Sequence, residues 1–142
     1  MRRTLSVAFA TVGLTLVCMP ANAALVNVYV FNFDFSTNAP PGSINDPIIN
    51  LGDTVRWNWI DDLHSTTSVA GIPEVWDSGV LNAGQTYDHT FTNPGTFWYF
   101  CTMHGFDNGN GTAQGMAGTV TVVPGECPRL PRLTTAPACR LR

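Results

Sequence analysis

Short stretches in which hydrophobic and polar residues alternate, or which are rich in β-forming residues, run along most of this 142-residue chain. In the first stretch Val26, Val28 and Val30 fall on one face, which is the two-residue period of a strand that buries one side. The pattern predicts strands at residues 25–35, 48–51, 54–60, 86–92, 96–101 and 118–123.

Turn-forming residues separate these stretches. Gly52-Asp53 and Asn93-Pro94-Gly95 are turn signals, and Pro40 and Pro41 end the first stretch. No segment of useful length has the hydrophobic spacing of an amphipathic helix. Asp77-Ser78-Gly79 interrupts a further stretch between the third and fourth of these stretches, so we expect about seven or eight short strands, as is typical of a β-sandwich. We therefore expect an all-β fold and one domain.

The first 23 residues have the composition of an export signal. Arg2 and Arg3 precede an apolar stretch from Leu5 to Cys18, and Ala21-Asn22-Ala23 is a small-residue cleavage site. This stretch is shorter than the run of about 18 apolar residues that a membrane span needs. We expect residues 1–23 to be removed and the rest to be periplasmic or secreted, with no integral membrane span.

Residues 125–142 differ from the body before them. They hold four of the seven basic residues and three of the ten prolines, without alternation. We expect residues 24–124 to form the folded domain and residues 125–142 a flexible tail. Cys127 and Cys139 lie in this tail and could pair in an oxidising compartment, but the sequence does not fix their pairing.

The charge of the body excludes one class of function. Residues 24–124 contain nine acidic residues and a single basic residue, Arg56. Proteins that bind nucleic acids neutralise phosphates with Lys and Arg, so we expect no nucleic-acid binding. The negative charge is equally compatible with simple solubility and with steering toward a basic protein partner.

Four side chains that bind metals occur in an ordered series. His64 follows one strand, Cys101 ends an aromatic strand, His104 comes three positions later, and Met116 opens the last strand. Alone, each has an ordinary explanation, such as core packing for the cysteine and the methionine. Together they supply one thiolate, two imidazoles and one thioether, which is the ligand set of blue-copper electron-transfer sites.

A longer series of landmarks surrounds these four residues. They are Gly52-Asp53-Thr54-Val55 with Trp57; His64 with Ser65 and Thr67; Phe91-Thr92 with Pro94-Gly95-Thr96; Tyr99; Cys101-Thr102 with His104; and Gly115-Met116 with Gly118, Val120 and Val122. In these residues the chain resembles the small cupredoxins of the plastocyanin and pseudoazurin type, over about residues 48–123.

The resemblance implies a Greek-key β-sandwich and one type 1 copper ion per chain, with His64, Cys101, His104 and Met116 as ligands. It also implies one-electron transfer through the edge of the His104 ring. By the same resemblance, Ser65 would form a hydrogen bond with Thr102 and tie the two ligand loops together.

Two features depart from the pattern of that family. The segment Gly105–Gly115, between the second histidine and the methionine, is longer than usual. It either loops out and leaves the site intact or loosens the bond to Met116. In addition, Met103 stands where several relatives have proline, so its N–H could donate to the Cys101 sulfur. Such a bond would weaken thiolate donation to copper and raise the reduction potential.

The sequence therefore predicts a monomeric one-electron carrier, not an enzyme, that docks transiently near His104 on redox proteins such as a cytochrome, an oxidase or a reductase. The alternative is a copper-binding or delivery module that uses the same ligands without shuttling electrons.

Three other metal proteins fit less well. A copper enzyme needs a second copper site, and the chain has only three histidines. A zinc site would not use Met116, because zinc prefers nitrogen, thiolate and oxygen donors. A binuclear copper site needs two cysteines in the ligand loop, where the chain has only Cys101.

Overall fold

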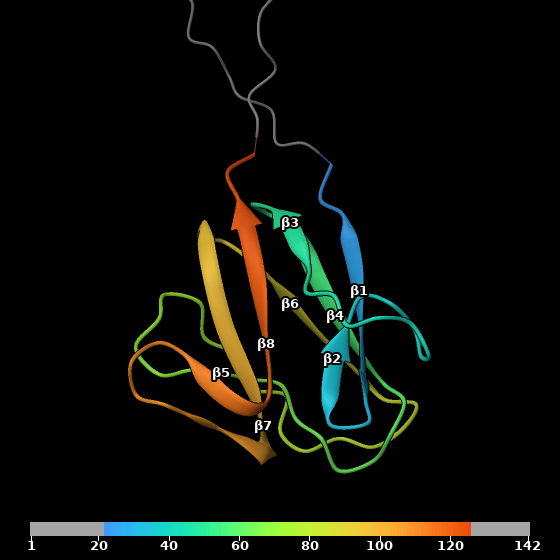
Figure 1. Cartoon of the computed structure of the whole chain (residues 1–142). Coiled ribbons are helices and arrows are strands. Elements are labelled where there is room, and N and C mark those ends of the chain that lie inside the picture. The colour runs from blue at the N-terminus through green and yellow to red at the C-terminus, as the bar shows by residue number, and fades with distance from the viewer. Residues whose placement is uncertain (1–21, 126–142) are drawn as a thin grey trace, which may run out of the picture. The chain divides into compact units, whose positions relative to one another are not determined.

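The computed structural model describes residues 22–125, which form eight β-strands and no helix (Figure 1). The strands are β1 (Leu25–Phe31), β2 (Asp34–Ser36), β3 (Ile48–Asn50), β4 (Thr54–Trp59), β5 (Thr67–Ser68), β6 (Thr86–Thr90), β7 (Gly95–Asp107) and β8 (Ala113–Val123). None of the described residues belongs to a helix that could cross a membrane. Nearly all of the expected signal and tail, with Cys127 and Cys139, lies outside the described residues.

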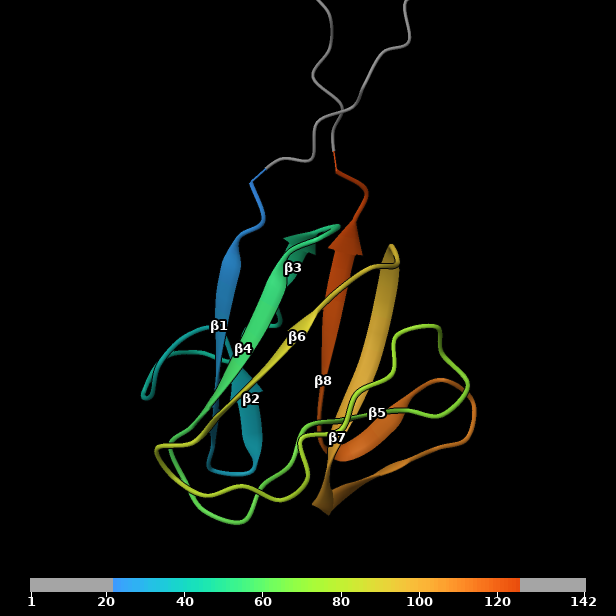
Figure 2. The ribbon, with the colours of Figure 1, turned by 180° about the vertical axis from the view of Figure 1, so that it is seen from behind.

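Two four-stranded sheets form the two layers of the domain. The first has the order β2-β1-β4-β6 and the second the order β3-β8-β7-β5. Each sheet contains one parallel pair, β1 with β4 and β3 with β8, and its other neighbours are antiparallel. Figure 2, seen from behind, places β4 and β6 in front of β7 and β8. The expected Greek-key β-sandwich is confirmed.

Alternation along the strands builds the core between the layers. In β4 every second residue is buried, and Trp57 of this strand meets Tyr99 of β7 edge-on, with ring centroids 5.5 Å apart. In β7 the buried positions are Phe97, Tyr99 and Cys101. Cys101 therefore lies on the core-facing side of β7, and hydrophobic packing of its own strand holds it in position.

The structure corrects the expected bounds of three strands in two places. Residues 25–35 are not one strand, because the chain reverses at Asn32 and Phe33 and returns as β2. The last two strands are longer than expected, since β7 continues to Asp107 and β8 begins at Ala113. Both corrections concern residues at the same end of the domain.

Candidate metal centre

The antiparallel ladder between β7 and β8 is interrupted at the predicted ligands. The pairs that flank the interruption are Phe100 with Ala117 and Gly105 with Gly115. Residues 101–104 of β7 therefore lie opposite a single residue of β8, Met116. A bulge lets the longer strand bend and re-aim its side chains. Here it brings Cys101 and His104 together, as the sequence predicted.

His64 reaches the same place from the loop after β4. Its backbone is held by an isolated bridge, in which His64 N–H donates to the Leu81 carbonyl (3.3 Å) and Leu81 N–H donates back (2.8 Å). The indole N–H of Trp59 also donates to the His64 carbonyl at 2.8 Å. These bonds fix the position of a histidine that is only 3% exposed.

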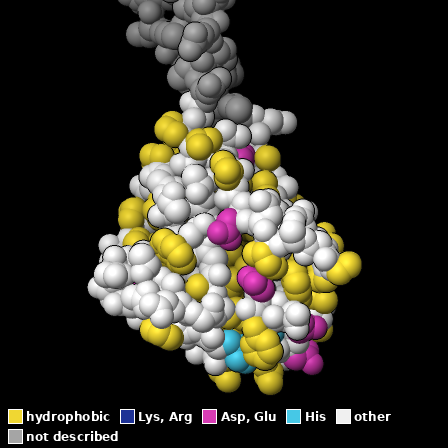
Figure 3. Space-filling model, in the orientation of Figure 1, with side chains coloured by type: hydrophobic (Ala, Val, Ile, Leu, Met, Phe, Trp, Pro, Cys, Tyr) yellow, Lys and Arg dark blue, Asp and Glu magenta, His cyan; other side chains and the backbone are white. Residues whose placement is uncertain are grey.

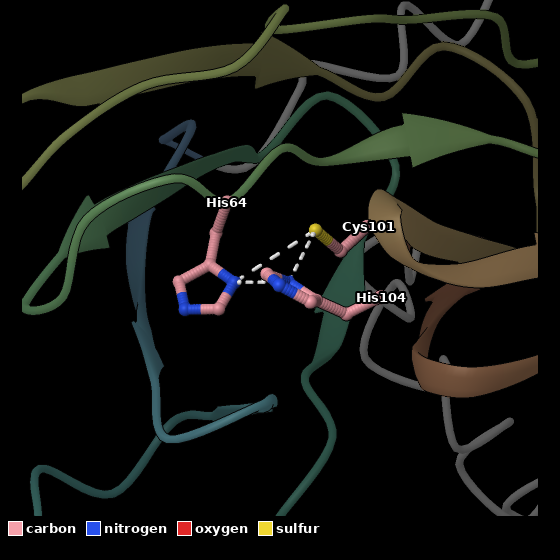
Figure 4. Close-up of side chains that lie close together, drawn as sticks. All are labelled: His64, Cys101 and His104. Atoms are coloured by element: carbon pink, nitrogen blue, oxygen red, sulfur yellow. Dashed lines mark hydrogen bonds between the residues drawn. The ribbon is translucent and has the colours of Figure 1, made fainter.

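The donor atoms of the three residues point toward one another (Figure 4). The Nδ1 atoms of His64 and His104 are 3.0 Å apart, and they lie 3.8 Å and 3.5 Å from the Cys101 sulfur. A point equidistant from the corners of this triangle lies about 2.0 Å from each atom, close to the 2.0–2.3 Å of metal–nitrogen and metal–sulfur bonds. The donor set and its spacing thus fit a single metal ion.

The two ligand-bearing segments are tied together beside the sulfur. Ser65 N–H donates to the Cys101 sulfur (3.3 Å), and Thr102 N–H donates to the Ser65 hydroxyl (2.9 Å). The Ser65 and Thr102 hydroxyls are also 3.0 Å apart, so the expected bond between these residues is confirmed. The expectation for Met103 is wrong: within residues 22–125 the backbone N–H that donates to this sulfur belongs to Ser65.

The surroundings of His64 favour a neutral imidazole ring. Burial lowers the pKa of His64, and the nearby His104 lowers it further, while Asp61 opposes the change. A neutral ring has a free lone pair for a metal ion. Because His104 is only half-buried, its ring is the one donor of the three that reaches the surface.

Met116 is placed beside this cluster by the strand register. It lies on β8 opposite the bulge, is only 2% exposed, and belongs to the same buried cluster as Cys101. Its side chain could therefore serve as the fourth donor that the sequence suggested. This role remains a prediction.

The long segment between His104 and Met116 is an extension of the β7–β8 hairpin. Residues 105–107 pair with residues 113–115, and the turn is closed by a bond from Asn108 N–H to the Thr112 carbonyl (3.0 Å). The strands approach closely because both positions of one pair are glycines, Gly105 and Gly115. A Cβ atom on Gly115 would lie 2.6 Å from the His104 carbonyl oxygen.

Sequence analysis missed two features of the structure. Glu74 is 3% exposed and accepts hydrogen bonds from His89 (3.0 Å) and from the backbone and side chain of Asn93. His89 also stacks on Trp76. The second feature is Phe33, whose ring contacts both histidines of the cluster. Only the polar Asn32 before it hinted at a turn.

Comparison with known proteins agrees with the fold and the cluster. No protein-family model matches the chain. An oxidized amicyanin variant is 26% identical with a TM-score of 0.51, covering 69% of this chain and 81% of the other. A reduced Cu(I) amicyanin variant is 26% identical with a TM-score of 0.52, covering 72% and 85%.

A Cu-containing nitrite reductase from Thermus scotoductus SA-01 is also similar in fold. It is 23% identical with a TM-score of 0.53, and the match covers 69% of this chain but only 22% of that chain. Amicyanin is a blue-copper cupredoxin, so the resemblance to small blue-copper proteins is confirmed by these similarities together with the His64, Cys101 and His104 cluster.

Proposed function

We propose that this cupredoxin-like chain is a one-electron carrier with one type 1 copper ion, held by His64, Cys101, His104 and Met116. The observation that carries the proposal is the convergence of two imidazole nitrogens and one thiol sulfur, 3.0–3.8 Å apart, on one point at the end of the sandwich. Two histidines and one cysteine with a weak axial methionine suit blue copper.

The protein's own contribution is to hold these donors still. Bound copper supplies the couple between Cu(I) and Cu(II). Cys101 is held by the core packing of β7, and His64 by its bridge to Leu81. Ser65 N–H donates to the Cys101 sulfur, which tempers the donation of charge from the thiolate. Because the donors are already in place, little rearrangement accompanies a change of charge.

Electrons would enter and leave through the ring of His104, the more exposed of the two imidazoles. Figure 3 shows histidine side chains at the lower end of the domain among hydrophobic ones. Leu63 and Met103 are exposed hydrophobic residues that directly precede the ligand His64 and the ligand His104 in the sequence. A small apolar patch of this kind suits weak, transient docking of a monomer to a redox protein.

The charge of the domain indicates which redox partners it would meet. Within residues 22–125 there are nine acidic residues against Arg56, and Arg56 is paired with Asp88 at 2.6 Å. We propose docking on a partner with a basic surface, such as a cytochrome, an oxidase or a reductase. We further propose that the protein is exported by cleavage near Ala23 and acts in the periplasm or outside the cell.

We propose no enzymatic activity for the isolated chain. A copper enzyme needs further histidines for a second copper ion, and the third histidine, His89, bonds to Glu74 on another part of the sandwich. Copper delivery was the alternative because the long ligand segment suggested a loose site. The structure shows that segment as a paired hairpin, which favours a carrier that retains its copper.

A redox titration of the copper-loaded protein with a strong copper chelator present distinguishes these functions. A carrier passes reversibly between its two states over repeated cycles, with one electron per chain and no copper lost to the chelator. A delivery module loses copper in one of the two states. Repeating the cycles with Met116→Leu tests the axial ligand, because loss of that bond should change the potential and leave the electron count the same.

A further inference from the structure

Phe33 occupies an unusual position in the turn between β1 and β2. Phe31 pairs with Asp34, so Asn32 and Phe33 alone form the loop. Their φ angles are 49° and 63°, and positive φ at both positions defines a type I′ turn. Asparagine is common at the first position of this turn and glycine at the second. A phenylalanine at the second position is strained, because its Cβ is crowded in the left-handed region.

The ring of Phe33 explains why the strain is tolerated. It meets the His104 ring at 4.6 Å and the His64 ring at 5.7 Å between centroids, in both cases edge to face at 88°. This is a favoured geometry for aromatic pairs. Phe33 is nevertheless 61% exposed, so burial of its surface does not account for its position.

A hydrogen bond fixes the turn to the segment that carries His64. Asn32 N–H donates to the Asp61 carboxylate at 2.7 Å, and Asp61 lies three residues before the histidine. The aromatic ring is therefore anchored to the same part of the chain that it contacts. Strained residues held in this way often mark functional sites.

We propose that Phe33 is a positioning residue of the metal centre. Its ring lies against the imidazoles of His64 and His104 and keeps their Nδ1 atoms directed at the Cys101 sulfur. It also shields the outer side of the half-buried His104 from water. The proposal rests on the proposed metal-binding function.

The test compares Phe33→Gly and Phe33→Leu with a matched control. Phe33→Gly gives the turn its preferred residue and removes the ring, whereas Phe33→Leu keeps an apolar side chain without the aromatic contact. The control is Phe106→Ala, which removes an equally exposed phenylalanine (57%) that has no ring contact with a histidine among the described residues.

Two measurements are made on each protein. In the metal-free state, nuclear Overhauser contacts between the His104 ring and the Cys101 β-protons report the orientation of the imidazole, with the His89 ring as internal reference. In the copper-loaded state, the rate of copper loss to a chelator reports how firmly the site holds its ion. The thermal unfolding temperature of the metal-free protein reports whether a substitution in the turn changes the stability of the fold.

We expect Phe33→Gly to weaken the His104 contacts and to accelerate copper loss about three- to tenfold, the range of an aromatic pair. Its unfolding temperature should equal or exceed that of the wild type, because the strain is relieved. Phe33→Leu should show the same faster loss, and Phe106→Ala should not.

Two results would overturn the proposal. One is a Phe33→Gly protein with wild-type ring contacts and copper loss, whatever its unfolding temperature. The other is an equal acceleration in Phe106→Ala. The metal-free measurement also separates the two ideas. If the wild type bound no copper while the ring contacts still depended on Phe33, the metal function would fail and the positioning contact would stand.

Discussion

The close approach of Gly115 to His104 makes a quantitative prediction about the hairpin that carries the ligands. Gly115 has a φ of 80°, and a Cβ atom there would meet the His104 carbonyl oxygen at 2.6 Å and the Gly105 Cα at 2.9 Å. An alanine in the left-handed region costs about 1 kcal/mol. Forcing two backbones apart costs about 2 kcal/mol more, which is typical of overpacking. Gly115→Ala should therefore lower the free energy of unfolding by about 3 kcal/mol.

Gly111→Ala is the matched control for this substitution. Gly111 lies in the turn of the same hairpin with a φ of 83°, but a Cβ atom there has nothing within 4 Å. Gly111→Ala should therefore lower the free energy of unfolding by only the cost of the left-handed backbone conformation, about 1 kcal/mol. The free energies of unfolding are measured by urea unfolding of the metal-free proteins. They are compared between variants whose free energy falls with urea concentration at the same slope.

The two variants should also differ at the metal site. The atom that Gly115→Ala displaces is the carbonyl of His104 itself, so this variant should have altered visible absorption after copper loading. Gly111→Ala should have the wild-type spectrum. Equal losses of stability in the two variants, or an unchanged spectrum in Gly115→Ala, would refute the close approach as the reason for a glycine at this position.

Three further predictions follow from buried polar contacts. Ser65→Ala removes the acceptor of Thr102 N–H and should lower the free energy of unfolding by about 1–2 kcal/mol, measured by urea unfolding, whereas removal of the exposed Thr96 hydroxyl should cost less than half as much. Burial raises the pKa of Glu74, but hydrogen bonds from His89, Asn93 and Thr92 outweigh it and lower the pKa below 4.5. The contribution of Glu74 to the free energy of unfolding is thus complete above that pH and is lost as the pH falls through the folded-state pKa. Glu74→Gln should therefore make the free energy of unfolding fall less steeply in acid. An unchanged dependence of the free energy of unfolding on pH in acid would contradict this. Ala24 N–H donates to the buried Asp53 carboxylate at 2.7 Å, so a protein that begins with a free Ala24 ammonium should be about 1 kcal/mol more stable than its acetylated form, and Asp53→Asn should abolish the difference.

The strands and three of the candidate ligands could be predicted from the sequence for a physical reason. Alternation reports directly which side of a strand is buried, and in β7 it leads from Phe97 through Tyr99 to Cys101. His104 is three residues away, so local chain geometry brings it to the cysteine. His64 comes from the loop after β4, so local geometry does not bring it to the cysteine, and only the ligand set and the family resemblance connected it to the other two.

The features that could not be predicted depend on tertiary contacts. A type I′ turn without glycine at its second position has no strong local signal, so the reversal at Asn32 and Phe33 was read as a continuous strand. The segment from Gly105 to Gly115 is rich in residues typical of loops. Its pairing depends on two glycines that meet across the hairpin, which no local pattern reveals.

The burial of Glu74 likewise depends on tertiary contacts. The charged residue is stabilised by Thr92 and Asn93, which lie far from it in the sequence and come close only in the folded domain. A lone acidic residue is usually solvated, so its residue type did not mark it as buried.

The most direct test of the central claim is a titration of Cu(II) into the purified protein, followed by visible absorption and electron paramagnetic resonance. We predict one equivalent of copper per chain, an intense thiolate-to-copper band and a narrow hyperfine splitting, all lost in Cys101→Ser. Stoichiometric binding with only a pale colour and a wide splitting would contradict the type 1 site, and with it the proposed electron carrier.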